Sequence, residues 1–283
     1  MSNPRKIVLT IDVEDWFQVR NMRGSYTRDQ WDGCENRLNI GLDFILEELD
    51  ARGIHATFFI LGWIAEKHPE EVQKIVRAGH EIASHGYSHK GLDELTPEEF
   101  DQDLRRSLQS LESLCGRKIN GFRAPSFSLT ERTWWAFDIL KKNQIAFDSS
   151  VYPVRHPNYG IPSFSKDPQR VAGVVEIPLT TCRVGGMDVP ISGGGYFRLY
   201  PYSLTRRLLT QTLRERSAIM YFHPWEFDPE PPQAKGLSPS QRFRHYVGLK
   251  ANRSKFHHLL KDFEFCTMDE FLSEKGFAVP RCE

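Results

Sequence analysis

The sequence predicts an α/β protein built around a parallel β-sheet, and three observations support this prediction. Short runs rich in β-branched and aromatic residues alternate with segments of helical periodicity along most of the chain, as in parallel strands joined by helical crossovers. The 283 residues are 40% hydrophobic, so the chain can bury a sizeable core. Ionisable residues follow directly on several of the predicted strands. The alternation fits both an open doubly wound sheet and a closed (β/α) barrel.

The first part of the chain alternates strands with helices. The β-branched run KIVLTI ends at Asp12, and leucine and isoleucine side chains further on recur near a helical period. Gly53 is placed to cap that helix, and Pro69 lies near the start of the next one. In order, we expect a strand at 6–11, a helix at 35–53, a strand at 56–62, a helix at 69–79 and a strand at 80–84.

The next helix has a defined start and end. Thr96 precedes Pro97 and lies three residues before Glu99, which is the pattern of a capping box with proline in the first turn. The helix is expected to end near Cys115 and Gly116. The elements expected after it are a strand with a turn at 120–126, a helix at 130–143, a strand at 145–150, an irregular region at 151–188 that contains a strand at 174–179, a helix at 202–216, a strand at 217–223, a proline-rich surface loop at 224–240 and a final helix at 242–263.

The composition argues against several classes of protein. Lys+Arg and Asp+Glu number 37 each, and no basic stripe indicates a nucleic-acid partner. Five scattered cysteines without a CxxC pair argue against a disulfide framework and fit a reducing compartment. The first apolar run is too short for a signal peptide, and no window approaches the roughly 20 apolar residues of a membrane span. We therefore expect a cytoplasmic protein with no transmembrane segment, and the sequence leaves homo-oligomerisation open.

Ionisable side chains stand where predicted strands end, and in a parallel barrel these ends lie on one face, where active sites are built. Taken alone, Asp148 could cap a turn, Arg123 could form a surface ion pair and His223 could be a hydrogen-bonded core residue. Together they form a candidate acid–base set, because a histidine needs a partner to be protonated near neutral pH. The residues at strand ends are Asp12, His85, His89, Arg123, Asp148 and His223.

The segment SHGYSH raises the question of a metal site. Its two histidines, His85 and His89, are four residues apart, and neutral imidazoles suit zinc and similar ions. The alternative is an ordinary polar turn, but the acidic cluster of TIDVEDW at another strand end makes that alternative weaker. Asp12 and Glu14 would share a face if the strand continued, whereas Asp12 and Asp15 would approach each other if a turn began there. One acid could then bind the metal while another acts as a base.

The glycine-rich segment SGGGYFRLYP offers a candidate substrate surface. Glycine lets the backbone approach a ligand, and the rings of Tyr196 and Phe197 can stack on a sugar face. Trp225, which lies beside His223 in the sequence, is a further candidate for the groove. The alternative is a tight turn before the helix that begins at Tyr202. The segment lacks the glycine pattern of a nucleotide-binding loop.

These motifs, in this order, resemble those of the polysaccharide deacetylase family, also called the NodB-homology or carbohydrate esterase 4 family. SHGYSH resembles the family's metal motif, with Gly86 in place of its Ser/Thr, RAPSF resembles its Arg-x-Pro motif and MYFHP resembles its last motif. The resemblance covers most of the chain, from TIDVED to YFHPWE. The first motif departs from the family, which usually has two adjacent aspartates where this chain reads D-V-E-D.

A subgroup that resembles bacterial allantoinases and a peptidoglycan deacetylase has a D-x-D version of the first motif. Against that version Asp12 matches the base and Glu14 the metal ligand, while against the adjacent form Asp15 is the competing ligand. We prefer Glu14 and keep Asp15 as the alternative. The segments DSSVYP, VVEIPL, GGGYF and HPWEFDP are most similar to deacetylases encoded with exopolysaccharide export clusters.

The resemblance implies a fold and a cofactor. The fold is a distorted (β/α) barrel, often with seven strands, here as a single domain over 1–283 with a C-terminal extension from about 228. The cofactor is a divalent metal, with zinc expected, and its implied ligands are His85, His89 and either Glu14 or Asp15.

The resemblance also implies an activity, the metal-dependent N-deacetylation of a polysaccharide or of a lipid-linked glycan intermediate. Asp12, held by Arg123, would take a proton from water, and the Ser126 N–H would help to hold the oxyanion. His223, paired with Asp148, would protonate the leaving amine. The implied substrate-binding residues are Ser126, Phe127, Tyr196, Phe197 and Trp225.

Three other functions compete with this one. An allantoinase-like hydrolase of a small cyclic amide would use the same fold and acids. A carbohydrate-binding barrel without turnover would not need Asp12 and His223 together. A two-histidine, one-carboxylate iron oxygenase usually carries its acid two residues after the first histidine, where this chain has Tyr87.

Overall fold

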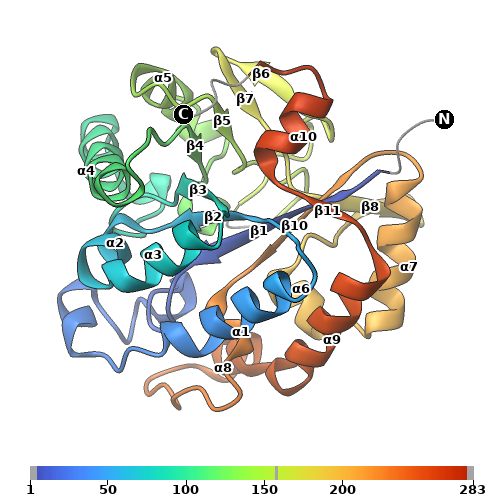
Figure 1. The fold of residues 1–283 in the computed structure, drawn as a ribbon, viewed down its shortest axis with the longest axis horizontal. Helices are drawn as coiled ribbons and strands as arrows, with labels where there is room; N and C mark the ends of the chain where they lie inside the picture. Colours follow the sequence, from blue (N-terminus) through green and yellow to red (C-terminus); the bar gives the residue numbers. More distant parts are fainter. Residues whose placement is uncertain (1–4, 157–158, 279–283) are drawn as a thin grey trace.

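The computed structural model describes residues 5–156 and 159–278. Its centre is a curled sheet in which seven strands run parallel in the order β10-β1-β2-β3-β4-β5-β7 (Figure 1). These strands are β1 (Ile7–Val13), β2 (Thr57–Ile60), β3 (Glu81–Ser84), β4 (Gly121–Phe122), β5 (Phe147–Asp148), β7 (Val174–Glu176) and β10 (Ala218–Phe222). Two further strands extend the sheet, β6 (Gln169–Val171) antiparallel to β7 and β11 (Phe265–Cys266) beside the start of β1.

The sheet curls into an incomplete barrel, because β7 and β10 do not pair directly in the described ranges. Between β7 and β10 the chain forms a hairpin of β8 (Thr181–Val184) and β9 (Met187–Pro190). The residues just before and just after this hairpin are hydrogen-bonded to β10. Tyr221 N–H donates to the Ser192 carbonyl at 2.7 Å, and Ile219 N–H donates to Thr180 Oγ1 at 2.6 Å. The structure thus confirms the predicted α/β class and the distorted parallel barrel.

Ten α-helices in the described ranges flank the sheet, and their buried faces complete the core (Figure 1). In α4, Thr96 accepts a hydrogen bond from Glu99 N–H and Gly116 takes a left-handed conformation, as the capping pattern predicts. The helices are α1 (Leu38–Asp50), α2 (Gly62–Lys67), α3 (Pro69–Arg77), α4 (Pro97–Cys115), α5 (Ala136–Lys142), α6 (Gly194–Leu199), α7 (Tyr202–Leu213), α8 (Pro239–Tyr246), α9 (Leu249–Asp262) and α10 (Met268–Glu274). No helix among them is both long and apolar enough to cross a membrane.

The structure differs from the sequence prediction in the last third of the chain. The final helix predicted at 242–263 is two helices, α8 and α9, which are separated at Val247 and Gly248. Arg198 Nη1 donates to the Val247 carbonyl at 2.7 Å, and Gly248 has φ 73° with its Cα packed against the Arg198 backbone, so a tertiary contact breaks the helix. The predicted turn before Tyr202 contains α6, and β11 and α10 were not predicted.

A glycine inside α1 allows this helix to approach the segment that follows β10. Gly41 packs against the 3-10 turn Pro224–Phe227, and a Cβ at Gly41 would overlap the carbonyl group of Pro224. Glycine is normally unfavourable in a helix by about 1 kcal/mol relative to alanine, so its presence here is explained by this close contact. The contact matters for function, because it fixes the backbone directly after His223.

We predict that Gly41→Ala lowers the melting temperature, although alanine is the better helix former. Overpacking costs about 1–3 kcal/mol, which corresponds to a fall of about 2–8 °C for a chain of this size. Gly195→Ala in α6 is the matched control, since its Cβ would meet Arg198 Nη2 at 3.9 Å without a clash. Thermal unfolding followed by circular dichroism measures both, and a Gly41→Ala protein as stable as the wild type would contradict the packing described.

Candidate active site and metal centre

The carboxyl ends of the parallel strands bring the predicted ionisable residues together. Asp12 and Glu14 come from the end of β1, His85 and His89 follow β3, and His223 follows β10. All five line one cavity of about 520 Å³. Arg123, which follows β4, is completely buried below the cavity. The strand-end pattern in the sequence therefore corresponds to one site in space.

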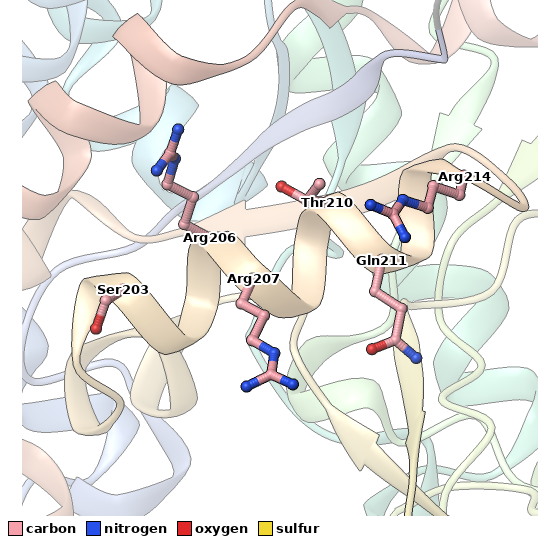
Figure 2. Close-up of a pocket in the computed structure, with 6 residues that line it drawn as sticks. All are labelled: Ser203, Arg206, Arg207, Thr210, Gln211 and Arg214. Atoms are coloured by element: carbon pink, nitrogen blue, oxygen red, sulfur yellow. The ribbon is translucent and has the colours of Figure 1, made fainter.

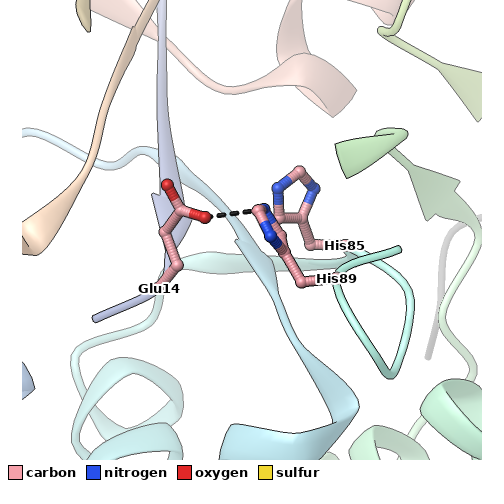
Figure 3. A group of neighbouring side chains, drawn as sticks. All are labelled: Glu14, His85 and His89. Atoms are coloured by element: carbon pink, nitrogen blue, oxygen red, sulfur yellow. Dashed lines mark ion pairs between the residues drawn. The ribbon is translucent and has the colours of Figure 1, made fainter. Parts of the chain in front are cut away.

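Glu14, His85 and His89 form the one group of three potential metal ligands found in the described ranges (Figure 3). Their ligand atoms lie within 4.8 Å of one another, and Glu14 Oε2 is 2.6 Å from His89 Nε2. His85 Nδ1 lies 2.8 Å from the Arg123 carbonyl, to which it donates, so Nε2 keeps the lone pair. This fixes the tautomer and the ring orientation that a metal ligand needs.

The protonation states of these groups suit a cation. Burial lowers the pKa of His85 to about 4, so this imidazole is neutral at pH 7. Burial opposes ionisation of Glu14, but the neighbouring His89 and His223 outweigh it and lower the pKa of Glu14 to about 2. Neutral imidazole and ionised carboxylate are the forms that bind metals.

The side chains of this group also fit a divalent metal ion. Glu14 Oε2 is buried, and although His89 Nε2 lies 2.6 Å from it, the two atoms do not form a well-aligned hydrogen bond, so a cation could satisfy this oxygen. Two histidine nitrogens and one carboxylate are a ligand set of catalytic zinc sites, which keep a further position open for water or substrate. The cavity provides that open side.

Asp15, the alternative ligand, does not belong to this group. Its carboxylate accepts hydrogen bonds from the backbone N–H groups of Trp16 at 2.7 Å and Arg37 at 2.8 Å, and Arg37 immediately precedes α1. Burial raises the pKa of Asp15 to about 7. The structure therefore corrects the prediction of Asp15 as a ligand, because Asp15 holds the start of α1 while Glu14 faces the histidines.

Asp12 is held by a buried ion pair with Arg123. Arg123 Nη1 donates to Asp12 Oδ1 at 2.6 Å and to Thr10 Oγ1 at 2.7 Å, while Nε and Nη2 donate to the carbonyl and hydroxyl of Ser149. The second carboxylate oxygen of Asp12, Oδ2, lies 3.9 Å from His223 Nε2. Asp12 Oδ1 is thus fixed by Arg123, and Asp12 Oδ2 faces the cavity.

His223 has a carboxylate partner that the sequence prediction missed. Its Nδ1 lies 3.1 Å from Glu226 Oε2, and Glu226 Oε1 accepts a hydrogen bond from Arg198 Nε at 2.8 Å. Burial lowers the pKa of His223, but the charges of Glu226 and Glu14 outweigh it and raise this pKa to about 9. The side chain of His223 is 15% exposed, so a proton held there at neutral pH can be reached from the cavity.

The predicted pairing of Asp148 with His223 is wrong. Asp148 accepts a hydrogen bond from Ser150 Oγ at 2.6 Å and lies beside Glu176, and burial raises the pKa of both carboxyl groups. Glu176 Oε1 also accepts from Val151 N–H, so the two carboxyl groups support the loop after β5. The spacing of His223 and Glu226, three residues apart in HPWE, is the signal that could have identified the correct partner.

The predicted substrate-binding residues separate into two groups. Ser126, Phe127, Tyr196 and Trp225 line the cavity. Phe197 does not, because its ring is buried against Phe222 at 5.0 Å between centroids, so its predicted role in the groove is corrected to a core role. Further lining residues, which the sequence prediction missed, include Arg20, His156, Tyr159, Leu199, Tyr221, Phe243, Arg244 and His245.

Backbone strain is concentrated around the cavity. His89, Ser126 and Phe127 have φ of 55°, 58° and 53°, a left-handed conformation that costs a non-glycine residue about 1–3 kcal/mol. Such conformations cluster at functional sites. The Ser126 N–H finds no acceptor within the described part of the chain, so it is available to a ligand.

Comparison with known families divides the chain in two. Residues 41–145 match the family described as polysaccharide deacetylase, and residues 149–273 match a family described as a domain of unknown function (DUF3473). A peptidoglycan deacetylase-like protein of Gibberella zeae is 31% identical over 155 residues, which are 52% of this chain and 44% of that protein. A peptidoglycan-N-acetylglucosamine deacetylase of Bacillus cereus is 30% identical over 128 residues, which are 38% of this chain and 46% of that protein. The chain therefore spans a little under half the length of these relatives.

Solved structures share the fold. A Mycobacterium smegmatis protein described among the polysaccharide deacetylases superposes with a TM-score of 0.62 at 18% identity, covering 99% of this chain and 94% of that one. A Bacillus anthracis protein described as a CE4 family pseudoenzyme gives a TM-score of 0.52 at 17% identity, covering 96% of this chain and 66% of that one. One of these proteins is described as a pseudoenzyme, so the fold alone does not distinguish a catalyst from an inactive relative. That distinction depends on the side chains of the site.

We predict that Glu14→Gln and His89→Ala each weaken zinc binding by more than about 100-fold, because changes outside the ligand set already cost about 10–100-fold. Asp15→Asn is the matched control and should retain zinc, although it should lower stability by loosening the start of α1. Isothermal titration calorimetry with zinc measures the affinity of each protein. Loss of zinc from Asp15→Asn together with retention by Glu14→Gln would contradict the assignment.

Proposed function

This chain belongs to the polysaccharide deacetylase family, and we propose that it is a metal-dependent N-deacetylase that hydrolyses acetamido groups of a polysaccharide or lipid-linked glycan. The observation that carries the proposal is the composition of one cavity. Glu14, His85 and His89 lie there beside a carboxylate, Asp12, and a histidine, His223, whose raised pKa keeps it protonated at neutral pH. Amide hydrolysis needs a base, an electrophile and an acid. A protein that only binds sugars does not need these three groups in one cavity.

Glu14, His85 and His89 would hold a divalent ion, and zinc is the best fit to two imidazoles and one carboxylate. When bound, the ion supplies Lewis acidity that polarises an acetamide carbonyl and makes water a better nucleophile. The tautomer of His85 is set by its hydrogen bond to the Arg123 carbonyl. Arg123 therefore both orients this metal ligand and forms the buried ion pair with Asp12.

The remaining residues move protons and hold charge. Asp12 Oδ2 accepts the proton of the attacking water, while Arg123 keeps the other oxygen of that carboxylate in place. The Ser126 N–H donates to the oxyanion that forms when water adds to the carbonyl carbon. His223 then donates its proton to the nitrogen as the C–N bond breaks, and the products are acetate and a free amine.

We also propose that residues 1–283 form one catalytic domain with an extension from about 228, because the candidate site draws on both family segments. His85, His89 and Arg123 lie in the first segment, whereas His223 and Glu226 lie in the second. Helix α8, from the extension, forms part of the cavity wall. The resemblance of GGGYF and HPWEFDP to deacetylases of exopolysaccharide clusters supports a role in exopolysaccharide biosynthesis and a cytoplasmic location.

We predict that the wild-type protein with zinc releases acetate from N-acetylglucosamine oligomers, and that Asp12→Asn lowers kcat by about 10²–10⁴-fold because it removes the base. Asp138→Asn, an exposed position on α5, is the matched control and should be unchanged. Acetate release is measured together with the zinc content of each variant, which separates lost chemistry from lost metal. Turnover by zinc-loaded Asp12→Asn within threefold of the wild type would remove this role, and activity on allantoin alone would favour a cyclic-amide hydrolase.

We predict that Glu226→Gln shifts the alkaline limb of the kcat/KM profile to lower pH. The acid must be protonated, so activity falls as pH rises through the pKa of His223, which Glu226 helps to raise to about 9. Removing that negative charge lowers this pKa, and we expect a shift of about one pH unit or more. Glu230→Gln, exposed on the same segment, is the control. An alkaline limb that stays in place in Glu226→Gln would mean that another group is the acid.

A further inference from the structure

The mouth of the active-site cavity carries cations that its own carboxylates do not balance. Among the described residues that line the cavity, the carboxylates are Asp12 and Glu14, and both are engaged at its base. The guanidinium groups of Arg20 and Arg244 line the same cavity, as does that of Arg198, which is paired with the buried Glu226. The chain as a whole has 37 basic and 37 acidic residues, so this excess of positive charge is local.

Arg244, on α8, is the clearest of these cations. It is exposed, its Nε donates to the Ser240 carbonyl at 3.4 Å, and it forms no ion pair with a carboxylate of the described residues. Arg198 Nη2 donates to the Arg244 carbonyl, and the pKa of His156 is lowered by burial and then by the charge of Arg244. Because the lowered pKa of His156 favours its neutral form, Arg244 is the charged group on this side of the cavity, and an unpaired guanidinium there favours an anionic ligand.

Arg20 adds a second, partly free guanidinium at the same cavity. Its Nη2 donates to Asp93 at 3.0 Å, whereas its Nη1 has no acceptor among the described residues. It lies in the 3-10 turn Arg20–Met22 near the N-terminus of the chain, far in sequence from Arg244. Two arginines from separate elements therefore reach one cavity, and guanidinium groups suit the planar oxygens of carboxylate and phosphate.

Apolar side chains stand beside these cations. Phe243, next to Arg244, is 59% exposed, and Leu199 is 50% exposed, and both line the cavity. Tyr159 and Tyr196, whose hydroxyls are 3.0 Å apart, also line it. Aromatic rings beside a cation suit a ligand that presents a sugar face and a negative charge.

We propose that the mouth of this cavity is an anion subsite, and that the substrate is an N-acetylated glycan with a carboxylate or phosphate on the unit next to the reacting acetamide. Arg244 and Arg20 bind the anionic oxygens, and Phe243 covers the sugar ring. The inference rests on the proposed function, because the position of the reacting acetamide is set by Glu14, His85 and His89. Both sources of charge, a uronic acid and a sugar phosphate, offer the same oxygen chemistry.

A second arginine-rich hollow provides a control for unspecific attraction. It runs along α7 and is lined by Ser203, Arg206, Arg207, Thr210, Gln211 and Arg214 (Figure 2). These residues do not line the active-site cavity, and Arg206 is paired with Asp262 at 3.0 Å. Arg207→Gln therefore removes the same charge as Arg244→Gln from a surface outside the candidate site.

The experiment compares three probes with the zinc-loaded enzyme: neutral chitotetraose, a tetrasaccharide that alternates N-acetylglucosamine with glucuronic acid, and chitobiose 1-phosphate. We expect kcat/KM for at least one anionic probe to exceed that for chitotetraose by about tenfold, as for a charge-assisted hydrogen bond. Arg244→Gln and Arg20→Gln should remove most of this preference through KM, because the contact is the same in ground and transition states. Arg207→Gln should leave the preference unchanged. The preferred anionic probe identifies the source of the charge.

The outcomes separate this inference from the proposed function. Deacetylation of chitotetraose as efficient as that of both anionic probes, or a preference that Arg244→Gln does not reduce, would overturn the anion subsite and leave the deacetylase standing. If no probe releases acetate, the proposed function fails. Isothermal titration calorimetry with the two anionic probes then tests the anion subsite independently of catalysis. Binding that weakens about fivefold or more in Arg244→Gln and at higher salt would support it, whereas equal or absent binding would overturn it.

Discussion

The buried ion pair between Arg123 and Asp12 is the constraint on which the rest of the site depends. Arg123 has no exposed surface and connects the strands of the curled sheet. Its guanidinium reaches Asp12 and Thr10 on β1 and Ser149 after β5, its Cζ lies 4.1 Å from the ring centre of Phe59 on β2, and its carbonyl orients His85 after β3. Removing one partner of such a pair leaves a buried charge uncompensated, at a cost of about 3–5 kcal/mol. The proposed base and one proposed metal ligand therefore depend on the same residue, Asp12 on its guanidinium and His85 on its carbonyl.

A second buried pair, between Arg198 and Glu226, performs the same task on the other side of the cavity. Arg198 comes from α6 and also donates to the carbonyls of His245 and Val247, so it connects the wall of the cavity to the partner of His223. The His245 ring is stacked on Trp225 with 4.5 Å between centroids, which extends this wall to the base of the site. The proposed acid, His223, and the cavity wall thus share one support, and we expect a change in α8 or α6 to alter the position of His223.

The sequence was informative where the signals are local. Alternating strand and helix patterns predicted most of the parallel sheet, and the residues at strand ends predicted Asp12, His85, His89 and His223 as neighbours. Periodicity alone did not choose between a barrel and an open sheet, and the family resemblance made that choice. The errors concern tertiary contacts: Asp148 pairs with Glu176 rather than with His223, and Arg198 breaks the last predicted helix at Gly248. Phe197 and Tyr196 are adjacent on a short helix, so the sequence could not show which of the two faces the cavity.

Anomalous diffraction at the zinc absorption edge, from crystals of the zinc-loaded protein, would locate the metal. We expect one strong peak bounded by Glu14 and by the Nε2 atoms of His85 and His89, with Asp12 and His223 on its open side. Crystals of the Glu14→Gln protein should show a much weaker peak at this position. A peak coordinated by Asp15, or zinc bound outside this cavity while acetate is still released, would show that Glu14, His85 and His89 do not form the catalytic metal site.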